Sequence, residues 1–155
     1  MIKLNRPLKL GFVGGGINSV IGQIHFSACQ LDNIWKVESG IFSENYKVSI
    51  KTAKIWNIPI KRVYKNLEEF IKKEKNILDA VVVIVPIPDH YKIIRELIKN
   101  KIPVISEKTM VANLDQTKKI YKLCKNNFLN VTYNYCGYPM IRELKSTMSY
   151  LRRRN

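Results

Sequence analysis

The sequence contains few of the residues from which disulfide frameworks and metal sites are built. Its 155 residues include three cysteines and two histidines. Cys29, Cys124 and Cys136 are odd in number, lie far apart and form no CxxC pair. This pattern excludes a disulfide scaffold, predicts no metal site, and favours a reducing, cytoplasmic environment.

Long apolar runs and acidic residues are also scarce. No uninterrupted apolar stretch approaches the roughly 20 residues of a membrane-spanning helix, and the N-terminus lacks the apolar core of a signal peptide. We therefore expect a cytoplasmic protein without a membrane partner. Against 12 Asp and Glu stand 27 Lys and Arg, a formal net charge of +15. The lysines are spread through nearly every expected helix, and the only dense basic cluster is at residues 152–154. This spread indicates a solvated lysine-rich surface, and nucleic acid is not expected as a partner.

Apolar periodicity divides the chain into alternating strands and helices. Strands are expected at residues 8–13, 35–42, 80–85, 102–105 and 129–133, with a short extended piece at 62–64. Helices are expected at residues 19–31, 45–56, 91–100 and 115–125, after Asn66, and from residue 140 onward. The β-branched run at residues 80–85 has no polar face, so it suits a central parallel strand covered on both sides. Together these elements predict a doubly wound α/β fold with a mainly parallel sheet and helices on both faces.

Glycine is concentrated in one place, with five of the seven glycines inside the twelve residues GFVGGGINSVIG. Read as GxGxxG, this stretch has Gly14 and Gly16 at the first two motif positions and Ser19 at the third, with Ile17 and Asn18 between them. The first glycine permits a tight turn, the second lets the backbone approach a pyrophosphate, and a small third residue allows close packing of helix on strand. A strand before the motif and a helix after it predict dinucleotide binding, with the helix amides directed at the phosphates. The alternative is an ordinary glycine-rich βα turn.

The residue that would contact the adenosine ribose is expected at the end of the second strand. Ser43 occupies that place, while Glu44 comes one position later and Glu38 lies in mid-strand. Because no acidic residue stands at the tip itself and Lys47 is close by, both NAD and NADP remain open as the cofactor.

Four separated stretches together resemble the Gfo/Idh/MocA family of NAD(P)-dependent sugar oxidoreductases. They are GGGINSVIGQIH at residues 14–25, DAVVVIVPIPDH at 79–90, VISEKT at 104–109 and VTYNYCGYP at 131–139. The resemblance implies a Rossmann domain that holds a nicotinamide cofactor across the carboxyl ends of its strands. It also implies a sugar or sugar derivative as substrate, bound over the nicotinamide.

The resemblance assigns further site residues. In the family a Glu-Lys-Pro sequence follows a strand, and its lysine reaches the substrate oxygen and assists proton transfer. Lys108 matches that lysine and is the expected catalytic residue, Glu107 matches the glutamate, and Thr109 replaces the proline. Pro86 and His90 match the loop that lies near the nicotinamide, although His90 also suits a structural role at a helix start.

Members of the family continue into an α/β domain that binds the sugar and completes the catalytic set. We therefore expect a dinucleotide-binding domain over residues 1–138, and over residues 139–155 the start of a helix leading to a C-terminal domain that this chain lacks. Such a chain resembles a truncated or split oxidoreductase with little turnover of its own.

The alternative is a non-catalytic dinucleotide-binding or docking module. The last expected helix carries an apolar stripe of Met140, Leu144, Met148 and Leu151. This stripe would serve docking to a C-terminal domain or self-association.

Overall fold

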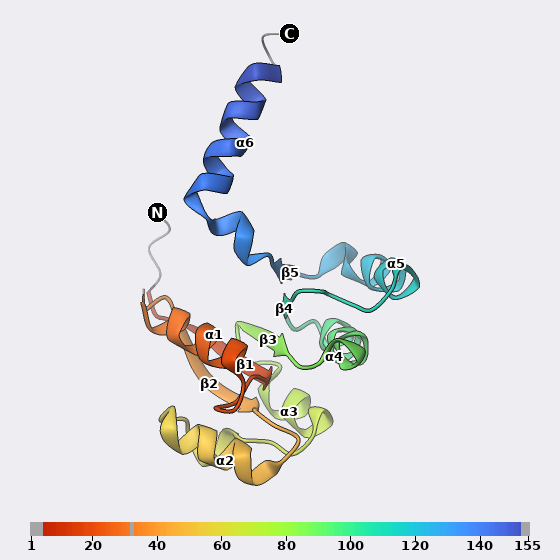
Figure 1. Cartoon of the computed structure of the whole chain (residues 1–155). Coiled ribbons are helices and arrows are strands. Elements are labelled where there is room, and N and C mark those ends of the chain that lie inside the picture. The colour runs from red at the N-terminus through yellow and green to blue at the C-terminus, as the bar shows by residue number, and fades with distance from the viewer. Residues whose placement is uncertain (1–4, 32, 153–155) are drawn as a thin grey trace.

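Five parallel strands form a single sheet in the computed structural model, which describes residues 5–31 and 33–152 (Figure 1). The strands are β1 (Leu8–Gly14), β2 (Trp35–Ile41), β3 (Ala80–Ile84), β4 (Val104–Glu107) and β5 (Leu129–Thr132). Their order in the sheet is β2-β1-β3-β4-β5, and all neighbouring pairs are parallel. The sheet confirms the doubly wound α/β fold expected from the sequence.

Helices cover both faces of this sheet and enclose one apolar core on each. The helices are α1 (Val20–Leu31), α2 (Tyr46–Ile55), α3 (Leu67–Glu74), α4 (Ile87–Lys99), α5 (Leu114–Leu123) and α6 (Pro139–Arg152). Residues of α1 and α2 pack in one core around Phe12 and Phe42, and residues of α3, α4 and α5 pack in the other around Phe70 and Leu97. Every residue of β3 is buried, as expected for a central strand between two layers of helices.

The extended piece expected at residues 62–64 begins only at Val63, because Arg62 ends a 3-10 helix (Ile60–Arg62), and it lies beside β2. Gly40 of β2 forms a parallel bridge with Val63, and the Tyr64 amide donates to the Gly40 carbonyl at 3.0 Å. The chain thus winds outward from β1 through β2 to this segment, then crosses over and winds the other way from β3 to β5. The direction reverses between β1 and β3, which is the point where open α/β sheets bind ligands.

The starts of α4 and β4 differ from the expected ones. Helix α4 begins at Ile87 rather than at residue 91, because Pro86 precedes it and Pro88 occupies its first turn. Proline is accommodated there since the first amides of a helix have no partner within it. Strand β4 begins at Val104 rather than at residue 102, because the Ile102 amide donates to the Leu97 carbonyl at 3.0 Å in the turn that ends α4.

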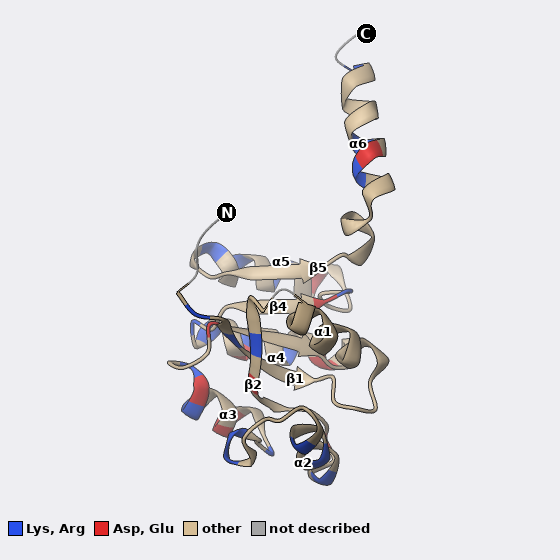
Figure 2. Ribbon diagram, turned by 90° about the vertical axis from the view of Figure 1, so that its left-hand side faces the viewer, with Lys and Arg blue, Asp and Glu red and all other residues tan. Residues whose placement is uncertain are grey.

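Helix α6 extends away from the sheet in both views of the molecule (Figures 1 and 2). Its apolar stripe is exposed, and Met140 retains 84% of its accessible surface. Arg152 ends the helix, and residues 153–155, including the rest of the basic cluster, lie outside the described residues. The division of the chain into domains at residue 138 stays a prediction.

Lysine and arginine are distributed over several helices and loops rather than along one stripe (Figure 2). Within residues 5–31 and 33–152, no helix combines the length and apolar character needed to cross a membrane. The same residues contain no group of three or more His, Cys, Asp or Glu side chains placed to hold a metal ion.

Candidate dinucleotide-binding site

The glycine turn that leaves β1 needs residues without side chains. Gly14 and Gly15 have φ values of +81° and +71°, in the left-handed region that favours glycine. A Cβ atom on Gly14 would overlap the Ile84 carbonyl of the neighbouring strand. One on Gly16 would lie 2.7 Å from the Phe42 carbonyl oxygen. The turn therefore passes close to β2 and β3 at the point where the winding reverses.

The close contact between helix and turn is made by Gly22, not by Ser19. A Cβ atom on Gly22 would overlap the Gly15 carbonyl, so α1 packs directly on the turn at this position. The Ser19 hydroxyl instead accepts a hydrogen bond from the Gly22 amide at 3.1 Å and caps α1. The sequence assigned this packing role to Ser19, and the structure gives it to Gly22 instead. Five residues separate β1 from α1, so the close contact falls on a glycine further along the chain.

Several backbone amides near this turn are available to an anion. The Gly16 amide donates to the Phe42 carbonyl at 2.9 Å, and the Ile17 amide donates to the Thr52 hydroxyl at 3.2 Å, so these two hold the loop in place. The amides of Asn18, Val20 and Ile21 donate to no acceptor in the described part of the chain. Unpaired amides at the start of a helix, together with its dipole, bind phosphate without a basic side chain.

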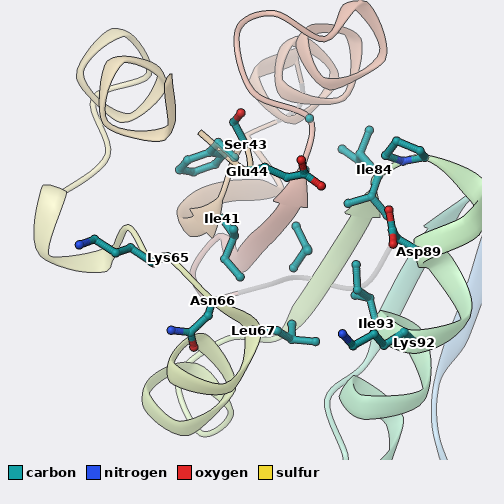
Figure 3. Close-up of a pocket in the computed structure, with 16 residues that line it drawn as sticks. Ile41, Ser43, Glu44, Lys65, Asn66, Leu67, Ile84, Asp89, Lys92 and Ile93 are labelled. Atoms are coloured by element: carbon teal, nitrogen blue, oxygen red, sulfur yellow. The ribbon is translucent and has the colours of Figure 1, made fainter. Parts of the chain in front are cut away.

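A cavity of about 570 Å³ lies at the carboxyl ends of β1, β2 and β3 (Figure 3). Ser43 and Glu44 line it at the end of β2, and apolar side chains from β2, α3 and α4, including Leu67 and Ile93, line its other side. The Glu44 carboxylate extends toward Ile84, whereas the Ser43 hydroxyl points away (Figure 3).

The turn after β2 explains these two orientations. The Ser43 hydroxyl accepts from the Asn45 amide at 3.2 Å, which engages it in the turn that starts α2. Glu38, at the nominal sequence distance, is paired with Arg62 at 2.6 Å and does not reach the cavity. Ser43 and Glu44 both line the cavity, and contact of either residue with the ribose stays a prediction.

A second cavity of about 420 Å³ adjoins the first across the end of β3. Both are lined by Ile84, Val85 and Pro86. The second is also lined by residues from three other parts of the chain, namely Ser19, Ile21, His90, Glu107 and Lys108. The fold therefore brings together Ser19, Pro86, His90, Glu107 and Lys108, five residues that the sequence proposed for one site.

The turn after β4 carries Lys108 at the rim of the second cavity. The Lys108 side chain is exposed, and its backbone amide donates to Glu107 Oε2 at 3.1 Å. Glu107 Oε1 lies 2.8 Å from Nε2 of His25 on α1. His90 is 1% exposed, and its ring nitrogens lie 2.8 Å from the Val85 carbonyl oxygen and 3.2 Å from that of Met110. Direct contact of these residues with cofactor or substrate stays a prediction.

A family model described as an oxidoreductase family with an NAD-binding Rossmann fold matches residues 8–135. The chain belongs to this family, Gfo/Idh/MocA, as the sequence resemblance indicated. It is an NAD-binding Rossmann domain of these oxidoreductases.

Individual relatives match most of this chain but only part of their own. The chain is 31% identical over 142 residues to the uncharacterized protein YMR315W of Saccharomyces cerevisiae, covering 90% of this chain and 39% of that protein. An inositol dehydrogenase homolog from Azotobacter vinelandii, solved with NAD⁺, is 25% identical with a TM-score of 0.88, covering 96% of this chain and 41% of that one. The transcriptional regulator Gal80p from Kluyveromyces lactis has the same fold at 24% identity, with a TM-score of 0.79. The match covers 93% of this chain and 37% of the Gal80p chain. The chain thus spans about two fifths of the length of these relatives.

Proposed function

We propose that this chain supplies the cofactor half of an NAD-dependent oxidoreductase that exchanges hydride with a carbon of a sugar or polyol. The observation that carries the proposal is the pair of adjoining cavities at the switch point, separated by the end of β3 and flanked by the free amides of α1. The bound nicotinamide would supply the redox chemistry, and the chain would supply binding, orientation and electrostatics. The substrate class is supported by the inositol dehydrogenase homolog among its structural relatives.

The two cavities suit the two halves of a dinucleotide. The larger offers an apolar wall, with Leu67 and Ile93, for an adenine ring and the Glu44 carboxylate for ribose hydroxyls. The amides of Asn18, Val20 and Ile21 suit the pyrophosphate. The smaller cavity, lined by Pro86 and Lys108 among others, suits the nicotinamide half.

Lys108 is the residue that we propose for proton transfer. Its side chain is exposed and lines the smaller cavity, where an ammonium group could donate a hydrogen bond to a substrate oxygen. A positioned lysine can hold the proton that leaves or joins that oxygen as hydride moves at the adjacent carbon.

Glu44 leads us to propose NAD rather than NADP as the preferred cofactor. A carboxylate accepts hydrogen bonds from the ribose 2′-hydroxyl and repels a 2′-phosphate. Titration of the chain with NADH and NADPH, followed by nicotinamide fluorescence, should show NADH binding roughly tenfold tighter or more. Glu44→Gln should narrow this ratio, whereas Glu68→Gln, at an exposed position on α3 outside the larger cavity, should leave it unchanged. Preferential binding of NADPH by the wild type would contradict the cofactor choice, and a folded chain that binds neither would contradict the proposed function.

A non-catalytic module is the second candidate function. It is favoured by the exposed apolar stripe of α6, and the fold is shared with a transcriptional regulator. An assay of NAD⁺ reduction with a panel of sugars and polyols, in which the chain is supplied with the C-terminal domain of a full-length relative, separates the two functions. Turnover that Lys108→Met abolishes while NADH affinity is kept supports the oxidoreductase, and tight NADH binding with no turnover in the presence of that domain supports the module.

A further inference from the structure

The two histidines of the sequence meet the same short segment from opposite sides. That segment, residues 107–110, starts at the last residue of β4 and contains Lys108. His25 comes from α1, and His90 comes from the first turn of α4. Neither ring belongs to the segment, yet each lies within hydrogen-bond distance of it.

His25 reaches the segment through Glu107. The Nε2 atom of His25 lies 2.8 Å from Glu107 Oε1, and the two side chains are only 17% and 15% exposed. The other carboxylate oxygen, Oε2, accepts from the Lys108 amide at 3.1 Å. The His25 ring is also packed edge-on against Phe12 of β1, with ring centroids 6.5 Å apart at 89°. Glu107 therefore links α1 to the backbone of the residue that carries the proposed catalytic side chain.

His90 reaches the segment from its other end. Nδ1 lies 3.2 Å from the Met110 carbonyl oxygen, while Nε2 lies 2.8 Å from the Val85 carbonyl oxygen beyond the end of β3. The ring is buried and lines the same cavity as Glu107 and Lys108. The segment thus lies between the loop after β3 and helix α1, whose first amides we propose for the pyrophosphate.

We propose that His25 and His90 are positioning residues that orient the Lys108 turn relative to the amides of α1. The inference rests on the proposed function, since it concerns how the nicotinamide side of that site keeps its shape. Small displacements of an orienting group lower the efficiency of a site strongly, so a turn held at both ends has a functional advantage. His25 acts through Glu107, and His90 acts by filling the space between the Val85 and Met110 carbonyl oxygens with its buried ring, which when neutral donates to one of them.

NADH and ADP are the two probes that test this arrangement. ADP has the adenosine and both phosphates but lacks the nicotinamide half. Its binding affinity should therefore not depend on the Lys108 turn. In His25→Leu and Glu107→Gln we expect NADH affinity to fall roughly tenfold, the scale of a lost charge-assisted hydrogen bond, with ADP affinity changed less than about twofold. His25→Gln, whose amide nitrogen can occupy the Nε2 position, should restore most of the NADH affinity. His90→Gln cannot place a nitrogen at both ring positions. It should also weaken NADH binding while leaving ADP binding nearly unchanged. The control Gln30→Leu, at an exposed position near the end of α1, should change neither.

Hydrogen exchange of the Lys108 amide without ligand gives a readout independent of cofactor. This amide should exchange several-fold faster in His25→Leu than in the wild type, with an unchanged unfolding midpoint showing that the fold is kept. A parallel loss of NADH and ADP affinity, or unchanged NADH affinity together with unchanged Lys108 exchange, would overturn the positioning role. Failure of the proposed function is a different result, in which the folded wild type binds neither probe while His25→Leu still accelerates exchange at Lys108.

Discussion

Replacing Gly22 by alanine is expected to abolish measurable NADH binding and to destabilise the domain by about 3 kcal/mol. The added Cβ atom would overlap the Gly15 carbonyl, which is backbone and cannot rotate aside. Either α1 moves away from the sheet or the turn deforms, and both carry the amides proposed for the pyrophosphate. Alanine favours a helix over glycine by about 1 kcal/mol, which is too little to offset the overlap.

The sequence contains a matched control for this substitution. A Cβ atom on Gly137 would meet no atom of the described residues within 4 Å, and Gly137 lies outside both cavities. Gly137→Ala should therefore unfold and bind NADH like the wild type. Urea unfolding followed by circular dichroism, together with NADH titration, compares the variants. Wild-type affinity and stability in Gly22→Ala would show that α1 and the turn are not packed as described.

Removing Arg62 is expected to cost about 3–5 kcal/mol, because it leaves a buried carboxylate without its partner. Glu74 is 1% exposed and accepts from Arg62 Nε at 3.0 Å and from Nη2 at 2.6 Å, and also from the Tyr64 hydroxyl at 2.7 Å. The hydrogen bonds from Arg62 to Glu74 are the main reason that the pKa of Arg62 is raised above its ordinary value, although burial opposes them. The guanidinium therefore stays charged.

Arg62 also ties the extended piece that begins at Val63 to the elements on either side of it. It joins Glu74 of α3 to Glu38 of β2, which it contacts at 2.6 Å. Since domains are stable by about 5–15 kcal/mol, Arg62→Ala should remove between about a fifth and all of the folding free energy and lower the urea midpoint in proportion.

An exposed ion pair on the same helix provides the comparison. Lys73 contacts Glu69 at 3.0 Å with side chains that are 57% and 42% exposed. Lys73→Ala should lower stability by less than about 1 kcal/mol, because exposed pairs are screened by water. Similar urea midpoints for Arg62→Ala and Lys73→Ala would contradict a buried network that holds this edge of the sheet.

The fold was predictable because its strongest signals are local. The uninterrupted run in β3 and the amphipathic spacing of the helices are readable along the chain, and their alternation leaves few topologies open. The helix expected after Asn66 is α3, and the Asn66 side chain caps it by accepting from the Glu69 amide at 2.9 Å. Helix α4 starts at Ile87, four residues before the expected start, because Pro88 has no amide to donate and therefore suits a first turn.

The site was less accessible to sequence reasoning because it depends on distances between segments far apart in the chain. The position of Gly22 on Gly15 follows from the length of the loop and could have been suspected from the glycine itself. The orientation of Glu44 into the larger cavity and the pairing of His25 with Glu107 have no signal in any local pattern.

The sequence by itself determined the class of fold, the family and the position of the glycine turn between the first strand and the first helix. Those properties follow from hydrophobic periodicity, from the left-handed backbone that only glycine adopts easily, and from motifs within single segments. Tertiary structure decided which side chains face each cavity, which amides remain free, and which part of the chain the two distant histidines contact. These depend on the parallel register of strands whose sequence separation is large, and no local rule encodes that register.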